Sequence, residues 1–425
     1  MPIHSKPQTN IFTAYLNPMV FYARFPHISE KIFENLNIKG LKNCRKVSKS
    51  WLKCIDNQNI LWNKIAENED CNKVLRCVIE KGHLKLTRFL IQKSTQLKID
   101  VNEKYTDLSD KTPFHLACEK GYLDIAELLI QKYAELNIDL DTQDIFGNTA
   151  FHLACMWGGS KIAERLLQKS IDFNINLNAK DDEGKTPFHQ ACFKGYEDIV
   201  EMMINYANSF DIDLKAIDEH FKTGFHHACM HGHLKIAERL IQKSNDFNIN
   251  LNAKDKNGRT PFHLACIEGH EDIVEMIINY AKSFDIDLTA EDLMLRTAFY
   301  HACMYGHSKI AERLIQKSTD FNINLNTKDY MDGRTPFHLA CIKGHGDIVE
   351  MMIDYASSFD IDLTATDENI KTGFQLAESH GKNYVVNIIK RKMPQIAELL
   401  IQKSAGLNIV LNTQDIFGRY QSNAF

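Results

Sequence analysis

Histidine and cysteine residues stand three positions apart at six places along the chain, and this pairing is where chemistry could arise. On a helix this spacing brings both side chains to one face, where they could supply two metal ligands or a thiol beside a base. A structural zinc ion needs four ligands, an active site does not need six copies, and Tyr300 replaces the histidine in a seventh copy. We therefore interpret the pairs as packing and hydrogen-bonding residues. They are His115/Cys118, His152/Cys155, His189/Cys192, His226/Cys229, His263/Cys266 and His338/Cys341.

A denser group of histidines, His226, His227, His231 and His233, lies in one of these copies. His227 and His231 are four residues apart, so they could share a metal ion on one helix face. No glutamate follows His227 as the metalloprotease motif requires, and the chain has no phosphate-cradling glycine loop or paired acid and base. We predict no catalytic site, no bound metal and no cofactor.

The segment that carries each pair recurs with a fixed period. Its clearest form is TPFHLACIEGH, in which the threonine is a good helix N-cap, the proline fits the first helical position and the glycine ends the helix. A longer helix with an apolar stripe follows, as in EDIVEMIINYA. Spacings of 37 residues, with one of 38, predict a stacked repeat array. The repeated threonines are Thr112, Thr149, Thr186, Thr223, Thr260, Thr297, Thr335 and Thr372.

The T-P-x-H-x-A start, the two antiparallel helices and the turn between units closely resemble the ankyrin repeat over about 112–393. The resemblance implies an all-α solenoid, here with about eight regular and two degenerate repeats, whose concave face binds proteins. It also implies that the repeated histidine hydrogen-bonds the backbone of the adjoining turn. The units alternate between a KIAERL type and a DIVEM type, so the duplicated element is a pair of about 74 residues.

The near-identical copies differ mainly after the aspartate of the turn and directly after the cysteine, positions that face the concave surface in the ankyrin family. We predict that they line a groove for a long protein partner, about 45 Å long if helices stack about 9 Å apart, with aromatic anchors. The alternative is that the apolar members only complete the packing between repeats. The predicted groove residues are Ile145, Phe146, Met156, Trp157, Phe193, Lys194, His220, Met230, His231, Lys256, Arg259, Ile267, Glu268, Met294, Met304, Tyr305, Ile342 and Lys343.

A different pattern precedes the array, FPHISEKIFENLNIKGLKNCRKVSKSWLKCIDNQNILWNKIA from Phe25. Its short apolar stripes predict four very short helices, a unit too small to be stable without a partner surface. The V-S-K-S-W run and the L-W ending resemble the F-box. That resemblance implies binding to a Skp1-like adaptor and, through it, to a cullin–RING ubiquitin ligase, whereas the alternative is a small helical cap on the array. The residues implied to approach the adaptor are Phe25, Pro26, Ile28, Ile32, Leu36, Leu41 and Val47.

The repeat pattern weakens at both ends of the array. We expect 103–111 to be a polar extension, and we expect the first helix near Glu378 to be loosened because a charged residue replaces the buried cysteine. The last segment is either a poor cap or an incomplete product. The predicted organisation is a disordered 1–20, an F-box-like domain at 21–67, a degenerate first repeat and join at 68–111, ankyrin repeats at 112–393 and an irregular or truncated terminal repeat at 394–425.

The composition excludes several classes of function. A net charge of −5 and a pI near 6.4 give no electrostatic reason to expect nucleic acid. There is no apolar secretory leader and no run near the roughly 18 apolar residues of a membrane span, so we expect a reduced protein of the cytoplasm or nucleus. The sequence predicts a non-catalytic substrate-recognition subunit of a Skp1–cullin–F-box ubiquitin ligase. The alternative is an ankyrin scaffold that acts outside ubiquitin transfer.

Overall fold

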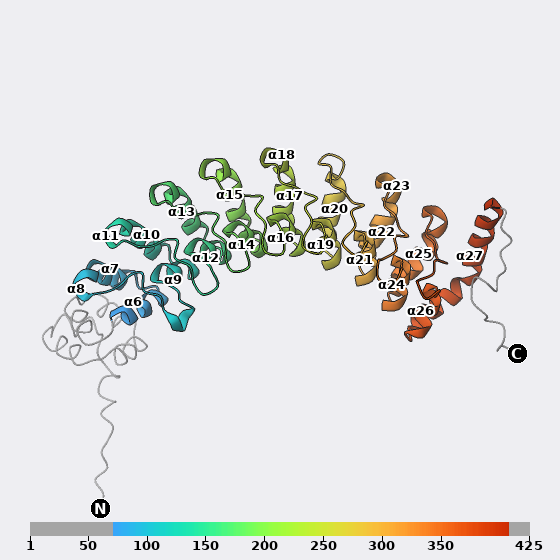
Figure 1. Cartoon of the computed structure of the whole chain (residues 1–425), viewed down its shortest axis with the longest axis horizontal. Helices are drawn as coiled ribbons and strands as arrows, with labels where there is room; N and C mark the ends of the chain where they lie inside the picture. The colour runs from blue at the N-terminus through green and yellow to red at the C-terminus, as the bar shows by residue number, and fades with distance from the viewer. Residues whose placement is uncertain (1–70, 408–425) are drawn as a thin grey trace, which may run out of the picture. The chain divides into compact units, whose positions relative to one another are not determined.

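Repeated pairs of antiparallel helices build the part of the chain that the structure, a computed structural model, describes, residues 71–407 (Figure 1). These residues contain three isolated β-bridges and no strand. They belong to two units, Met1–Asp181 and Asp182–Phe425. The predicted segments 1–20 and 21–67 lie outside the described residues, and so do the seven predicted adaptor-binding residues and the end of 394–425.

In Met1–Asp181 each repeat has a short first helix, which packs on the first helix of the neighbouring repeat, and a second helix behind it. The first helices are α6 (Cys71–Glu80), α9 (Pro113–Glu119) and α12 (Ala150–Met156). The second helices are α7 (Leu84–Gln92) with α8 (Ser94–Leu97), α10 (Leu123–Gln131) with α11 (Tyr133–Leu136), and α13 (Ser160–Phe173). The short 3₁₀ helix η1 (Thr106–Leu108) lies between the first two repeats.

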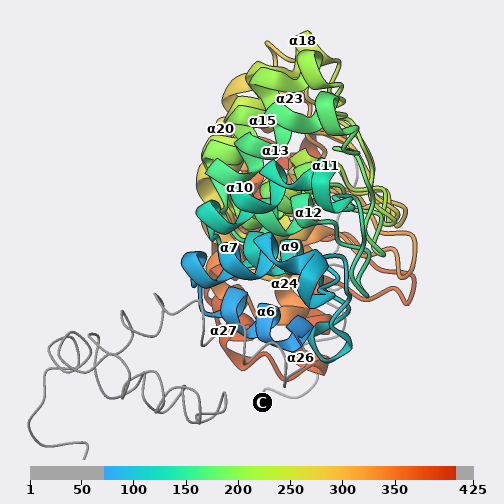
Figure 2. The same ribbon diagram turned by 90° about the vertical axis from the view of Figure 1, so that its left-hand side faces the viewer.

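Asp182–Phe425 contains six helix pairs of the same kind, in which first helices pack on first helices. The first helices are α14 (Pro187–Lys194), α16 (Gly224–Met230), α19 (Pro261–Glu268), α21 (Ala298–Tyr305), α24 (Pro336–Lys343) and α26 (Gly373–Ser379). The second helices are α15 (Glu197–Phe210), α17 (Leu234–Gln242) with α18 (Ser244–Phe247), α20 (Glu271–Tyr280), α22 (Ser308–Gln316) with α23 (Ser318–Phe321), α25 (Gly346–Phe359) and α27 (Asn383–Leu407). In Figure 2 the turns of this unit, green to orange, project to the right of the helices.

From α9 onward the first helices begin after the predicted threonine, and in six of them a histidine completes the cap. In α19 the backbone N–H of His263 donates to Thr260 Oγ1 at 3.4 Å, and the backbone N–H of Thr260 donates to His263 Nδ1 at 3.2 Å. His263 Nε2 then donates to the carbonyl oxygen of Arg296 in the next repeat, at 3.1 Å. One neutral imidazole thus caps its own helix and binds the following turn, a role that any titrating or metal-binding histidine could not keep.

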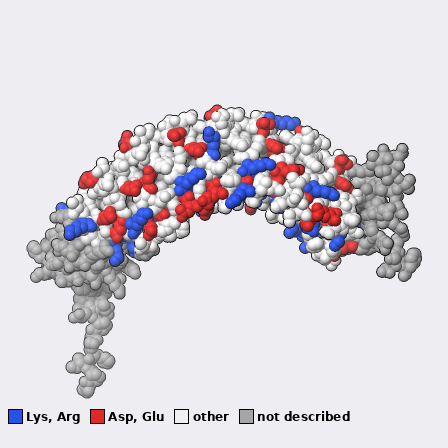
Figure 3. Space-filling view, viewed as in Figure 1, with Lys and Arg blue, Asp and Glu red and all other residues white. Residues whose placement is uncertain are grey.

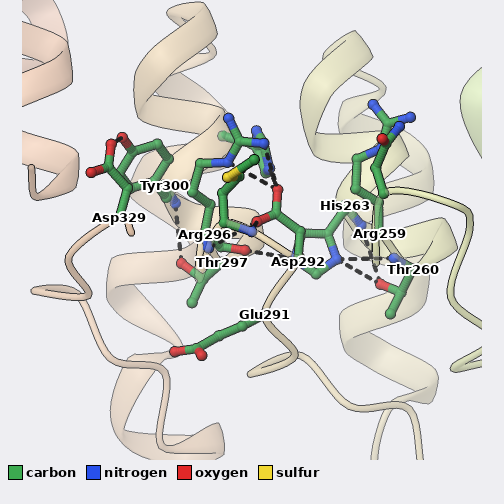
Figure 4. Close-up of polar contacts among 12 residues, drawn as sticks. Arg259, Thr260, His263, Glu291, Asp292, Arg296, Thr297, Tyr300 and Asp329 are labelled. Atoms are coloured by element: carbon green, nitrogen blue, oxygen red, sulfur yellow. Dashed lines mark hydrogen bonds and ion pairs between the residues drawn. The ribbon is translucent and has the colours of Figure 1, made fainter. Parts of the chain in front are cut away.

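Two first helices replace this histidine in different ways. Gln375 makes the same reciprocal cap with Thr372. Tyr300 accepts no bond from Thr297 but reaches further, and its hydroxyl donates to the Asp329 carboxylate (Figure 4). Asp329 directly precedes the turn 330–333, which is one residue longer than its counterparts.

Ion pairs between second helices follow the alternation of repeat types. Arg239 of α17 forms two hydrogen bonds of 2.7 Å with Glu201 of α15, and Arg313 of α22 forms the same pair with Glu275 of α20. At the junction between these pairs the tyrosine of α20 donates instead, from Tyr280 Oη to Glu238 at 3.0 Å. In the pairs α15–α17 and α20–α22 a DIVEM-type second helix therefore meets a KIAERL-type one through an arginine and a glutamate.

In most repeats the second helix, or the short helix or turn that extends it, leads to an asparagine or aspartate in the left-handed backbone region, whereas α8 ends at Lys98. Asparagine and aspartate tolerate a positive φ better than other non-glycine residues because their short polar side chains bond locally. They are Asn137, Asn174, Asp211, Asn248, Asp285, Asn322 and Asp360, with φ between 47° and 54°.

Three expectations for the ends of the array need correction. Residues 103–111 are not an extension but the turn before α9, closed by a bridge between Tyr105 and Lys111. Helix α26 is capped and formed, with Glu378 half-buried and 3.9 Å from Lys390 Nζ. Helix α27 runs through Pro394 across the predicted boundary at 393/394, because 388–393 contains no glycine, asparagine or aspartate that could end it.

None of the helices within 71–407 is long and apolar enough to cross a membrane.

Candidate protein-binding surface

The turns that precede the first helices form a connected row in Asp182–Phe425. We call each turn a finger, and the six together the finger row; the fingers are 182–184, 219–221, 256–258, 293–295, 330–333 and 368–370. The first residue of each finger donates its backbone N–H to a carbonyl oxygen of the preceding finger. The five bonds are Glu219 to Glu183 (3.0 Å), Lys256 to His220 (2.8 Å), Leu293 to Asn257 (3.0 Å), Tyr330 to Met294 (2.9 Å) and Glu368 to Asp332 (2.9 Å).

The aspartate before each finger holds the turn in shape. Asp255 Oδ1 accepts the backbone N–H groups of Asn257 and Arg259 at 2.9 Å each, and Oδ2 accepts from Arg259 Nε at 3.0 Å. Gly258 has φ +78°, and a Cβ there would lie 2.7 Å from the backbone nitrogen of Leu293. The finger is therefore fixed by main-chain contacts on both sides, so its side chains are free to differ.

Two fingers are also attached to the first helix that follows them. His227 Nε2 donates to Asp218 Oδ2 and His301 Nε2 donates to Asp292 Oδ2, both at 3.0 Å and both buried. Burial lowers the pKa of both histidines, and the aspartate offsets this only in part. Burial would raise the pKa of each aspartate, but hydrogen bonds from the histidine and the turn hold it well below its ordinary value. Each pair is a neutral imidazole bound to a carboxylate.

The predicted groove residues of this unit divide by burial. The residue directly after each cysteine is half-buried, whereas the next one is exposed in most repeats. Phe193 shows why, because its ring contacts the His231 ring of the next repeat with centroids 4.4 Å apart. Packing between repeats and an accessible edge therefore coexist at this position. The half-buried residues are Phe193, Met230, His231, Arg259, Ile267, Met304 and Ile342, and the exposed ones are Lys194, His220, Lys256, Glu268, Met294, Tyr305 and Lys343.

In Met1–Asp181 the predicted residues occupy the equivalent places. Ile145 and Phe146 lie on the finger before α12, and their side chains are 52% and 54% exposed. Trp157 follows α12 and is 56% exposed, while Met156 is half-buried. This unit therefore presents three large apolar side chains to solvent near one first helix.

In three repeats the residue before the capping threonine joins the two variable sites into one face. Lys185 Nζ lies 4.9 Å from the centre of the Phe193 ring, and Lys222 Nζ lies 3.3 Å from Met230 Sδ. In Met1–Asp181, Lys111 makes the same reach to Glu119, at 2.8 Å. In these three repeats a lysine thus connects the finger to the end of the first helix. We call the finger and the end of the first helix of a repeat its finger-and-first-helix face.

Sequence reasoning missed several exposed apolar residues of the finger row. Leu293 is 67% exposed, Tyr330 70% and Met331 65%, whereas only Met294 was predicted, and it is 38% exposed. The available signal was their position in the turn segments LMLR and YMDGR, which differ from every other copy. Arg259 was predicted as a partner contact, but its guanidinium is held by Asp255.

The recurrent histidine–cysteine pairs serve the fold. The histidine of each pair hydrogen-bonds its own threonine, and His263, for example, also bonds the next turn. Burial raises the pKa of cysteines such as Cys266 well above the usual thiol value. His227 Nε2 is committed to Asp218, so His227 and His231 are not arranged to share an ion. Within 71–407, no three His, Cys, Asp or Glu residues are grouped to hold a metal.

Neighbouring second helices also line hollows whose charged side chains pair with one another. A space of about 490 Å³ between α15 and α17 is lined by Glu197, Glu201, Lys235 and Arg239, which pair with one another. A space of about 420 Å³ between α20 and α22 repeats the same arrangement. These hollows are consequences of the ion-pair pattern, so the finger-and-first-helix face remains the candidate binding surface.

Comparison with protein families places this architecture. The family of ankyrin repeats (3 copies) matches four successive stretches, 52–139, 136–218, 209–292 and 285–367. The F-box domain family matches residues 24–63, which confirms the F-box resemblance and lies outside the described residues. Compared with curated proteins, the chain shows no significant match.

Proposed function

Because this chain belongs to the ankyrin-repeat family and carries an F-box domain ahead of its repeats, we propose that it is the substrate-recognition subunit of a Skp1–cullin–F-box ubiquitin ligase. In this function the F-box domain binds a Skp1-like adaptor, and the repeats bind the target protein. The adaptor connects the chain to a cullin–RING ligase, whose other subunits transfer ubiquitin. The chain is then a non-catalytic receptor of the cytoplasm or nucleus.

The observation that carries this proposal is the presence of two interaction modules in one chain. An F-box alone would recruit the ligase without a target, and repeats alone would bind a target without the ligase. The exposed apolar side chains Trp157, Tyr305 and Leu293 support target binding because they lie on the face where the copies differ. A scaffold outside ubiquitin transfer would need that face but not the F-box.

Purified Skp1 and the full chain provide the test. We expect capture of Skp1 by the full chain, and we expect loss of at least tenfold in affinity for Leu36→Ala combined with Leu41→Ala, because truncated apolar anchors remove contact area. Trp157→Ala is the matched control and keeps Skp1 capture, since it lies in the repeats. Failure of the full chain to capture Skp1, or equal capture by the double variant, would leave the scaffold as the better description.

A further inference from the structure

The finger row is a preformed surface rather than a set of independent loops. Five main-chain hydrogen bonds of 2.8–3.0 Å join successive fingers from Glu183 to Glu368. Each finger is also closed internally by its aspartate, as Asp255 and Asp292 show. A partner that binds this row does not have to order it first, so little conformational entropy is lost on the receptor side.

The side chains along the row change in a definite order. The first two fingers carry exposed acidic residues, Asp182 and Glu219, and the third carries exposed Lys256. The fourth and fifth carry the exposed apolar residues Leu293, Tyr330 and Met331. The second finger also exposes Phe221, and the sixth exposes Glu368 and Ile370. The most exposed charged and apolar side chains of the first five fingers nevertheless follow the order acidic, acidic, basic, apolar, apolar. Figure 3 shows acidic and basic side chains interspersed over the face that it draws.

The charges at these positions are available to a partner. Lys256 forms no ion pair within 71–407, although Arg259, three residues later, is bound to Asp255 at 2.9 Å. Asp182 and Glu219 likewise make no ion pair in that part of the chain. Complementary charge on a partner would thus gain contacts without breaking internal ones, which favours register and specificity.

The spacing of the fingers fixes the spacing of what they can recognise. Stacked helices lie about 9 Å apart, and one finger precedes each first helix, so successive fingers advance by about that distance. An extended chain advances about 3.3 Å per residue and a polyproline II helix about 3.1 Å. Three residues of an extended partner therefore span one finger, and five fingers span about 13 residues.

We propose that the finger row binds a segment of the target protein in the polyproline II conformation and reads every third residue, because three residues complete one turn of that helix and place every third side chain on one face. The segment carries basic residues opposite Asp182 and Glu219, an acidic residue opposite Lys256 and bulky apolar residues opposite the fingers 293–295 and 330–333. This inference rests on the proposed function, because it names the chemistry of the target that the repeats would recruit.

A phage library of random 16-residue peptides, selected on the full chain, tests the proposal. We expect enriched peptides that share a basic, basic, acidic, apolar, apolar pattern at three-residue intervals, in one chain direction. Affinities of two enriched peptides are then measured by calorimetry. Enrichment of peptides without this spacing, or no enrichment at all, would overturn the proposal.

Variants of the row sharpen the test. Lys256→Glu should weaken an enriched peptide at least tenfold, and a peptide with lysine in place of its acidic residue should recover that loss. Leu293→Ser combined with Met331→Ser should also weaken binding at least tenfold. Ile171→Ser is the matched control, because Ile171 is 72% exposed on α13 and lies outside the row. Equal affinity for the control and the row variants contradicts the proposal.

Skp1 capture on the same protein preparations separates the two proposals. If Skp1 is captured normally but the peptides bind the row variants and the unsubstituted chain with equal affinity, the proposal for the finger row is overturned and the ligase function is not. Peptide binding that follows the predicted pattern without Skp1 capture would overturn the ligase function and leave the row as a recognition surface of a scaffold.

Discussion

The two sides of the repeats in Asp182–Phe425 use charge in opposite ways. On the second-helix side, side chains join the repeats, as in the pairs Arg239–Glu201 and Arg313–Glu275. On the finger side, backbone groups join the repeats, and side chains such as Lys256 and Leu293 remain exposed. A side chain that holds the array together cannot change without cost, whereas a side chain on a backbone-bonded turn can. The finger side is therefore where partner selection can vary.

The largest effect that would test this comparison is the loss of unfolding free energy at low pH, where the buried capping histidines of the first helices become protonated on unfolding. Burial lowers the pKa of His189, His226 and His263 from 6.5 to about 4. A lowered pKa gives stability that is complete above pH 6.5 and is lost as the pH falls towards 4, by roughly 2 kcal/mol per histidine at pH 5. Urea unfolding of the full chain at pH 7.5, 6 and 5 measures this decrease in unfolding free energy.

The chain offers its own control for that titration, because Gln375 makes the same cap without a titrating ring. Replacing the three histidines by glutamine should flatten the dependence of unfolding free energy on pH between 6.5 and 4. An unchanged slope in the triple variant would show that other groups carry it. Asp218 and Asp292 contribute only below the ordinary aspartate pKa, since their own pKa values are lowered further.

A smaller effect tests the rigidity of the finger row. Gly258→Ala places a Cβ 2.7 Å from a backbone atom of the next finger at φ +78°, whereas Gly121→Ala at φ +68° meets no atom within 4 Å. We expect a loss of about 1 kcal/mol at Gly121 from backbone strain alone and about 2–3 kcal/mol at Gly258, where a clash is added. Thermal or urea unfolding measures both, and equal losses would show that the fingers yield easily.

The ion pairs of the second-helix side should contribute less. Arg239 and Glu201 have side chains 31% and 42% exposed. A double-mutant cycle of Arg239→Ala and Glu201→Ala should give a coupling of about 1 kcal/mol or less, reduced further at high salt. A coupling several times larger would mean that this side, rather than the buried histidines, controls stability.

The smallest effect is expected where binding should depend most on sequence. Leu293→Ser and Met331→Ser remove exposed side chains that pack on little, so the unfolding free energy should change by less than about 0.5 kcal/mol. Loss of stability beyond that range would place these residues in the framework and remove the contrast between the two sides.

The local rules of helix formation made the framework predictable from the sequence. Thr260 as a cap follows from residue type, and His263 as a partner of the next turn follows from the resemblance to the ankyrin repeat; the structure confirms both. The exposure of apolar turn residues was harder to predict, because residue types such as those of Leu293 and Tyr330 do not indicate whether a turn faces the core or the solvent. The pairing of Arg259 with Asp255 depends on turn geometry, which pattern alone does not give.

The finger with the extra residue shows what a backbone-bonded row permits. Finger 330–333 is one residue longer than the others, yet it still donates from Tyr330 to Met294 and accepts from Glu368 at Asp332. The lengthening is absorbed within a single turn and is not passed to its neighbours. After a duplication, a single finger can therefore change by substitution or insertion and alter what the surface recognises, while the helix pairs and the hydrogen bonds between fingers stay the same.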